Sequence, residues 1–151
     1  YIARGPSSCA GMPLIGSSRA RSEDVRSVLS SFSELHLSEP VLAGLSNAGF
    51  ERPSPVQLAA IPPGRFGADL VVQAKSGTGK TAVFGVVCAE SVKVDITKPQ
   101  ALIVAPTREI ALQIRDVVST IGASLPPSGL VVEAFVGGLP LEKDKARLTR
   151  P

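Results

Sequence analysis

The feature that most constrains the fold is an alternation of short apolar runs with segments of helical periodicity. The apolar runs occupy residues 69–74, 101–105 and 130–136, and each is followed by a helical pattern. Strands that alternate with helices favour a parallel sheet, because each helix returns the chain to the start of the next strand. We therefore predict an α/β fold with a partial parallel sheet flanked by helices.

Capping signals predict two short helices ahead of the first apolar run. Ser38 can cap a helix that ends before Gly49, a residue that suits the left-handed position just past a helix end. Ser54 can cap a second helix, which the Pro62-Pro63 pair should stop. Three more helices are predicted at residues 81–92, from the N-cap Thr107 onward, and at 141–148.

Length and composition indicate a globular domain. The chain has 151 residues, of which 44% are hydrophobic and 19% charged, a mixture that excludes wholesale disorder, collagen and coiled coil. Two cysteines, Cys9 and Cys88, and the single His36 cannot supply a four-ligand zinc site. No apolar stretch is long enough to predict a membrane span.

Residues 1–31 differ in composition from the rest of the chain. They are rich in Ser, Gly and Arg, and no acidic residue precedes Glu23. We predict a disordered tail here, with part of an organelle transit peptide as the less favoured alternative. Four arginines against two acidic residues give this tail most of the net charge of +3. Because Tyr1 and Pro151 both look like cut ends, we expect a fragment of a longer chain.

A glycine-rich loop between the first apolar run and the next helix predicts a phosphate site. Gly77 and Gly79 let the backbone curl so that its N–H groups and the helix N-terminus face an anion. Lys80 can reach the β and γ phosphates of a nucleotide, and the Thr81 hydroxyl can ligate Mg²⁺. A plain glycine-rich connection is the alternative. The loop consists of Ala74, Lys75, Ser76, Gly77, Thr78, Gly79, Lys80 and Thr81.

Four motifs in order resemble those of a helicase family. The loop begins with Ala74 instead of Gly, and A-x-x-G-x-G-K-T resembles motif I of superfamily 2 helicases. Residues 49–57, GFERPSPVQ, resemble the Q motif of DEAD-box RNA helicases, with the aromatic Phe32 upstream of it. Residues 106–111, PTREIA, resemble motif Ia, and 137–138 resemble the GG motif.

The resemblance implies a truncated N-terminal RecA-like helicase domain over residues 32–151, the first half of helicase lobe 1. By that resemblance, the Gln57 amide would read the adenine edge of ATP, Phe32 would cover the base and Arg52 would line the same pocket. The spacing alone supports another interpretation of Gln57 about equally well, because Ser54-x-x-Gln57 is itself a capping box.

RNA is the macromolecular partner that the resemblance implies. Thr107, Arg108, Gly137 and Gly138 would face the RNA sugar-phosphate backbone and bind it without reading sequence. The wording of the Q motif and motif I is most like a subfamily belonging to the survival-of-motor-neuron complex, which implies ribonucleoprotein-assembly proteins as further partners. The resemblance also implies a location in the nucleus and cytoplasm.

The 151 residues lack two parts that ATP hydrolysis needs, the acidic pair that holds Mg²⁺ and a cationic group that stabilises charge in the transition state. A phosphoryl-transfer ATPase holds Mg²⁺ with acidic groups that follow an apolar strand, but the only adjacent acidic pair here is Glu23-Asp24 in the tail. We therefore expect the ATP-binding portion of an ATP-dependent RNA helicase, itself inactive, with Lys80 and Thr81 as its contribution to catalysis. The alternatives are another P-loop nucleotide-binding enzyme such as a kinase, and a noncatalytic interaction module.

Overall fold

A computed structural model describes residues 31–93, 95–138 and 140–148 of the chain. The predicted disordered tail, residues 1–31, lies outside these ranges except for Ser31, and Cys9 lies outside them too. The elements in chain order are the 3-10 turn η1 (Phe32–Leu35) and the helices α1 (Glu39–Asn47), α2 (Pro55–Arg65), α3 (Lys80–Ser91), α4 (Arg108–Gly122) and α5 (Leu141–Leu148).

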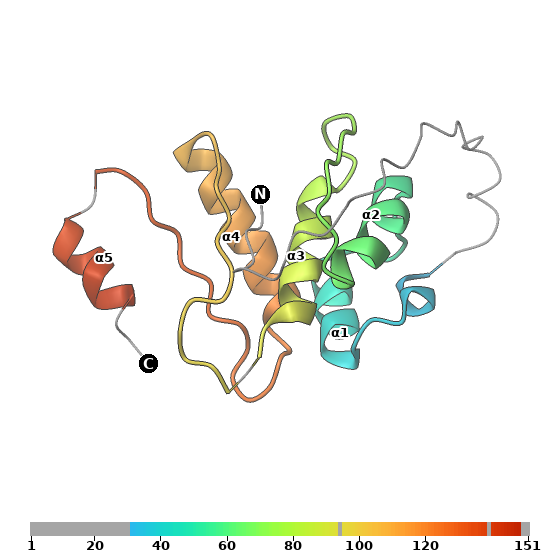
Figure 1. Ribbon diagram of the computed structural model, residues 1–151, viewed down its shortest axis with the longest axis horizontal. Coiled ribbons are helices and arrows are strands. Elements are labelled where there is room, and N and C mark those ends of the chain that lie inside the picture. Colours follow the sequence, from blue (N-terminus) through green and yellow to red (C-terminus); the bar gives the residue numbers. More distant parts are fainter. Residues whose placement is uncertain (1–30, 94, 139, 149–151) are drawn as a thin grey trace, which may run out of the picture.

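Helix α3 forms the centre of the helical packing. It contacts α2 on one side and α4 on the other, α1 contacts both α3 and α4, and η1 contacts α2 (Figure 1). A helix with neighbours all round buries most of its surface, and α3 is accordingly apolar over most of its length. The core is formed by Phe32, Leu35, Leu37, Val41, Leu45, Ala60, Ile61, Ala82, Val83, Val86, Ala89 and Ile121.

Helices α1 and α4 touch through a glycine. A Cβ atom at Gly44 would lie 1.8 Å from the backbone oxygen of Ile121, so only glycine fits at this contact. Gly85 of α3 faces the side chain of the same residue, and a Cβ atom there would lie 3.2 Å from Ile121 Cδ1. Small residues therefore allow α1, α3 and α4 to approach closely around Ile121.

Several helix ends follow the predicted capping signals. Helix α5 has the predicted range, and the Thr107 hydroxyl accepts a hydrogen bond from the Ile110 N–H at 3.3 Å at the start of α4. Gly49 adopts a φ of 78° just past α1, as expected for a helix end. Ser38 does occupy the N-cap of α1, but its hydroxyl donates to Glu90 instead of capping the helix.

The prediction that Pro62 and Pro63 stop the second helix is wrong, because α2 continues through both to Arg65. Proline removes an internal hydrogen bond and crowds the preceding turn. Tertiary packing offsets this cost, since Gly64 lies against α3 so closely that a Cβ atom would be 2.7 Å from Val87 Cγ2.

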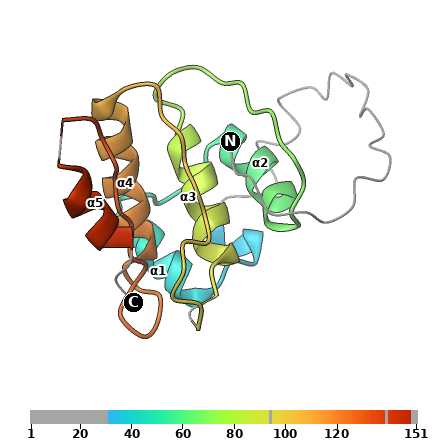
Figure 2. The ribbon, with the colours of Figure 1, turned by 60° about the vertical axis from the view of Figure 1, so that its left-hand side comes forward.

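The parallel sheet is not confirmed. Residues 69–74, 101–105 and 130–136 are described, yet none is assigned to a strand, and all three are drawn as plain ribbons between helices (Figures 1 and 2). A strand requires a neighbouring segment for its hydrogen bonds, and the backbone hydrogen bonds found outside the helices do not join these three segments. Within the described residues, these three segments are therefore connections between helices.

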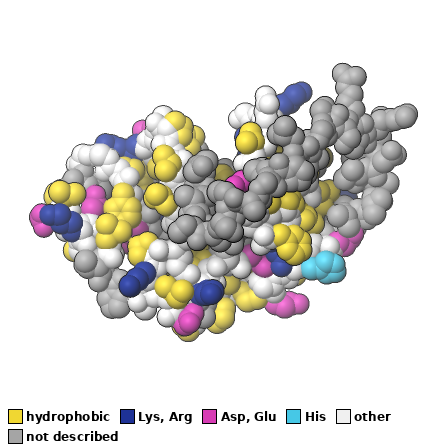
Figure 3. All heavy atoms as spheres, viewed as in Figure 1, with side chains coloured by type: hydrophobic (Ala, Val, Ile, Leu, Met, Phe, Trp, Pro, Cys, Tyr) yellow, Lys and Arg dark blue, Asp and Glu magenta, His cyan; other side chains and the backbone are white. Residues whose placement is uncertain are grey.

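The unpaired segments leave apolar side chains at the surface. Val71 is fully exposed, and Leu102, Val104 and Val131 are each more than half exposed. Apolar atoms are spread widely over the face in Figure 3. Among the described helices, none combines the length and apolar character needed to cross a lipid bilayer.

Helix α5 is attached to the segment that precedes it through one arginine. Arg147 pairs with Glu133 and donates to Asp144 Oδ1 at 3.3 Å, and its guanidinium lies 5.3 Å from the centroid of the Phe135 ring. The hydrogen bond to Glu133 raises the pKa of Arg147. These contacts fix α5 against residues 130–136.

Candidate nucleotide-binding site

The glycine-rich loop runs directly into the N-terminus of α3. Gly77 and Gly79 have φ angles of 76° and 84°, in the left-handed region that favours glycine. Gly79 is the N-cap of α3, so the free backbone N–H groups of the first turn lie beside the loop. The positive end of the helix dipole adds to this field, and the arrangement favours an anion such as a phosphate.

Lys80 folds back across its own loop. Its Nζ donates to the backbone oxygens of Ala74 and Lys75 at 2.6 Å each, and the Thr78 hydroxyl also donates to Lys75 O at 2.8 Å. Because these acceptors are neutral, a phosphate anion would be a stronger partner for the ammonium group. Thr81, the second residue of α3, is half-buried.

The start of α2 is bonded to this loop through two side chains. Gln57, only 2% exposed, accepts from the Ser54 N–H at 2.7 Å and donates through Nε2 to Gly79 O at 3.1 Å. The Ser54 hydroxyl donates to Thr78 O at 2.8 Å. Sequence reasoning missed the Ser54–Thr78 contact, because the two residues come from segments that only the fold brings together.

The capping-box interpretation of Gln57 is confirmed, and it leaves the amide able to bind more. A glutamine amide has two N–H donors and an oxygen with two lone pairs. The bonds to Ser54 and Gly79 use one donor and one lone pair. These two bonds leave one N–H and one lone pair of the amide unused.

Two further residues assigned to the adenine pocket lie in different surroundings. Phe32 is 4% exposed and belongs to the helical core, whereas Arg52 is exposed in the turn before α2. Gln57 is joined to the loop by its hydrogen bond to Gly79 O, whereas no hydrogen bond or ion pair among the described residues joins Phe32 or Arg52 to the loop. Their role toward a base stays a prediction.

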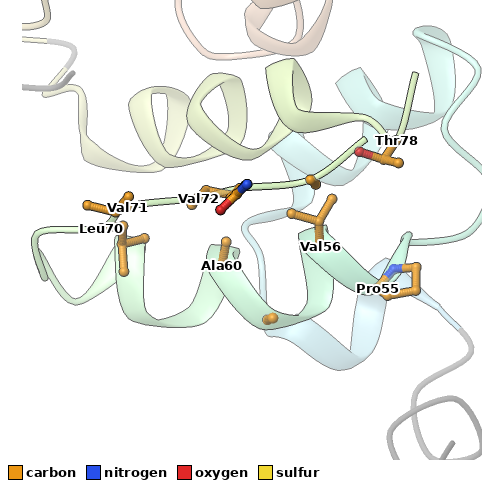
Figure 4. Close-up of a pocket in the computed structure, with 10 residues that line it drawn as sticks. Pro55, Val56, Ala60, Leu70, Val71, Val72 and Thr78 are labelled. Carbon is orange, nitrogen blue, oxygen red and sulfur yellow. The ribbon is translucent and has the colours of Figure 1, made fainter. Parts of the chain in front are cut away.

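An apolar groove of about 510 Å³ lies next to the loop, between α2 and the extended segment that precedes the loop. Figure 4 shows Val56 and Ala60 of α2 facing Leu70 and Val72, with Thr78 at the loop end. Sequence reasoning missed this groove, although the apolar residues of α2 recur at helical spacing and were a usable signal.

The four residues assigned to RNA come from two turns that meet in space. The Arg108 guanidinium donates to Gly137 O, and a Cβ atom at Gly138 would lie 3.1 Å from Arg108 Nη2. Gly138 has a φ of 90°, and Thr107, Arg108 and both glycines are exposed. The start of α4 and the turn before α5 thus form one exposed polar surface.

An acidic residue at the start of α4 has a shifted pKa. The pKa of the Glu109 carboxyl lies below its ordinary value, first because the carboxylate accepts from its own backbone N–H and second because it accepts from the Thr107 hydroxyl. Both donors belong to the first turn of the helix, where a negative charge is favoured.

The site fits a nucleotide phosphate better than it fits an isolated metal ion. The loop supplies a lysine and free N–H groups for phosphate, whereas the described part of the chain holds no group of three or more His, Cys, Asp or Glu residues suited to a metal. For Mg²⁺ it offers the Thr81 hydroxyl, so the metal would depend on phosphate oxygens for further ligands.

Three comparisons identify the family. The family model described as DEAD/DEAH box helicase matches residues 54–151. Over 139 residues the chain is 54% identical to a protein of Mus musculus named a probable ATP-dependent RNA helicase, DDX20. That match covers 90% of this chain and 16% of the mouse protein, so the chain spans about a sixth of that relative.

Solved structures agree with this match. A DEAD box protein from the hyperthermophile Methanococcus jannaschii has a TM-score of 0.71 and 32% identity, covering 79% of this chain and 32% of that one. Dbp5 of S. cerevisiae, bound to RNA and ADP BeF3, has a TM-score of 0.61 and 28% identity, covering 80% and 35%. These neighbours are RecA-like helicase domains. The chain belongs to the DEAD/DEAH box helicase family.

Proposed function

We propose that this chain is the ATP-binding portion of an RNA-dependent ATPase, an ATP-dependent RNA helicase that remodels or unwinds RNA and ribonucleoprotein. The observation that carries the proposal is the pair of bonds that join the start of α2 to the phosphate loop, from Gln57 to Gly79 and from Ser54 to Thr78. These bonds join the start of α2, which would bind the base, to the glycine-rich loop, which would bind the phosphates.

Adenine recognition rests on the unused part of the Gln57 amide. One N–H and one lone pair match the N6 donor and the N7 acceptor of adenine, whereas guanine offers two acceptors on the same edge. A buried amide whose position is fixed by two protein bonds discriminates well, because a mismatched base leaves it unsatisfied. We assign Phe32 to the base and Arg52 to the pocket wall on the motif resemblance.

The loop residues 74–81 would hold the phosphates of ATP. Lys80 would exchange its two backbone acceptors for phosphate oxygens, and the Thr81 hydroxyl would hold Mg²⁺. When bound, Mg²⁺ neutralises charge on the phosphates. Because the only adjacent acidic pair in the sequence is Glu23-Asp24, we expect the 151 residues to bind nucleotide but turn it over very slowly.

RNA would bind along the surface formed by Thr107, Arg108, Gly137 and Gly138. The exposed cation, the helix N-terminus and the glycine turn are all groups that contact a nucleic-acid backbone without reading bases. RNA present in the Dbp5 structure supports this assignment. The motif wording supports ribonucleoprotein-assembly proteins as partners and the nucleus and cytoplasm as the location.

We also propose that residues 69–74, 101–105 and 130–136 become strands of a parallel sheet in a complete first lobe. Their support is the alternation with helices and the exposure of Val71 and Val131, which a sheet would cover. Hydrogen exchange in full-length protein tests this. Protection of these amides beyond that in the 151-residue chain is expected, and equal exchange would contradict the proposal.

Nucleotide selectivity of the full-length protein tests the function. We expect ADP to bind more tightly than GDP, and Gln57→Ala to reduce this ratio about tenfold, because roughly two hydrogen bonds are lost. The control is Gln113→Ala, which alters the same residue type at an exposed position on α4 and should leave the ratio unchanged. An undiminished ratio in Gln57→Ala would favour a different P-loop enzyme, such as a kinase.

A further inference from the structure

An ion pair between Arg65 and Glu90 joins helices α2 and α3 far from the phosphate loop. Arg65 Nη2 lies 3.1 Å from Glu90 Oε2, and the side chains are 26% and 9% exposed. Each residue stands at the C-terminal end of its helix. Such a pair is held more firmly than a surface pair, because little of the glutamate is accessible to water.

The same two side chains hold the segment that follows Phe32. Arg65 Nη1 donates to Leu35 O at 2.8 Å. The backbone N–H and the hydroxyl of Ser38 each donate to Glu90 Oε1 at 2.8 Å. Both carboxylate oxygens and two guanidinium nitrogens therefore have partners. Arg65 binds η1, and Glu90 binds the N-cap of α1.

The pair also connects the far ends of the two helices that form the nucleotide site. Helix α2 carries Gln57 in its first turn and Arg65 at its end, while α3 begins with Lys80 and carries Glu90 near its end. At about 1.5 Å per residue, each member of the pair lies about 12–15 Å from the site. Among the described residues, the hydrogen bonds and ion pair of Arg65 and Glu90 reach Leu35, Ser38 and each other, and none reaches residues 74–81.

We propose that Arg65 and Glu90 are positioning residues that set the base-recognising side of the site relative to the phosphate loop. This inference rests on the proposed nucleotide-binding function. The base side comprises the start of α2 and the turn that carries Phe32. The pair hydrogen-bonds to this turn at Leu35 O and holds the far end of α2, whereas Lys80 and the first N–H groups of the phosphate site belong to the first turn of α3. Loss of the pair should therefore weaken recognition of the base and spare recognition of the phosphates.

The test measures the affinity of full-length protein for ADP, GDP and inorganic tripolyphosphate by competition against a fluorescent adenine nucleotide. We expect Glu90→Gln to weaken ADP binding about tenfold, because the variant loses one charge-assisted hydrogen-bond network. The affinities for GDP and tripolyphosphate should stay within about twofold of the wild-type values. Arg65→Lys keeps the charge but cannot serve both Leu35 and Glu90, so its effect should be intermediate. Matched controls are Asp116→Asn and Arg115→Lys, which alter an exposed ion pair on α4.

Several outcomes would overturn the proposal. A parallel loss of affinity for all three ligands, together with a lower Tm, would show that the pair only stabilises the fold. Unchanged ADP affinity in Glu90→Gln, while Gln57→Ala abolishes adenine preference, would refute the positioning role and leave the proposed function intact. A wild-type protein without adenine preference would refute the proposed function, and this inference with it.

Discussion

Substitution of Gly79 by alanine tests the contact between the phosphate loop and α2. A Cβ atom at this position would lie 2.4 Å from Gln57 Nε2 and 3.3 Å from its Cδ, so the amide has to move and its bond to Gly79 O is lost. That loss costs about 1–2 kcal/mol. The φ of 84° costs an alanine about another 1–2 kcal/mol. We expect Gly79→Ala to lower the free energy of unfolding by about 2–4 kcal/mol.

Gly77 provides the matched control within the same loop. Its φ is 76°, nearly that of Gly79, but a Cβ atom there meets nothing within 4 Å. Gly77→Ala should therefore cost the backbone strain alone, about 1–2 kcal/mol. In a Gln57→Ala background the space opposite Gly79 is open, so Gly79→Ala should then cost no more than Gly77→Ala.

The cycle compares the wild type, Gln57→Ala, Gly79→Ala and the double variant, with Gly77→Ala as the control. Urea unfolding without nucleotide, followed by far-ultraviolet circular dichroism, gives the free energy of unfolding of each protein. The expected coupling energy between positions 57 and 79 is about 1–2 kcal/mol. Equal costs for Gly79→Ala and Gly77→Ala in the wild-type background, or a coupling energy near zero, would refute the contact between Gln57 and the loop.

Three shorter predictions concern other parts of the chain. Lys80→Met should weaken binding of inorganic tripolyphosphate at least about tenfold by calorimetry, because it removes the cation of the loop; unchanged affinity would contradict a phosphate site. Gly44→Ala should lower the free energy of unfolding by about 3 kcal/mol or more in urea, because its Cβ would lie 1.8 Å from Ile121 O, and a neutral effect would contradict the α1–α4 contact. The lowered pKa of Glu109 means that its stabilising contribution is complete above the unfolded-state pKa and is lost as pH falls through the folded-state pKa. Glu109→Gln should therefore make the free energy of unfolding less dependent on pH in acid, measured by urea titrations at several pH values. A pH profile identical to that of the wild type would contradict the lowering of this pKa by the Glu109 backbone N–H and the Thr107 hydroxyl.

Most helices could be predicted from the sequence because their signals are local. The N-cap Thr107 lies at the start of α4, and the range 141–148 is that of α5. The loop glycines were predicted for the same reason, since a positive φ is a requirement of one residue. Motif order then sufficed to predict the family, which the family model confirms.

Side-chain partners between distant segments could not be predicted. The Ser38 side chain was expected to cap α1, yet its hydroxyl donates to Glu90, which lies far along the chain. The spacing left two roles open for Gln57, and the structure supports the capping role while adding a bond to Gly79 that no local pattern encodes. In each case the outcome depends on which helices become neighbours.

The unconfirmed sheet follows from the same distinction between local and distant bonds. A helix satisfies its backbone within one segment, so the pattern that predicts α3 also supplies its hydrogen bonds. An apolar run supplies only half of a strand pair, and residues 69–74 and 101–105 have no ladder bonds to each other. Helix α3 nonetheless begins immediately after the loop, with Lys80 and Gly79 oriented by the helix and by Gln57. Gly79 and Lys80 are therefore held by the start of α3 and by the hydrogen bond from Gln57, without ladder bonds between these two described apolar runs.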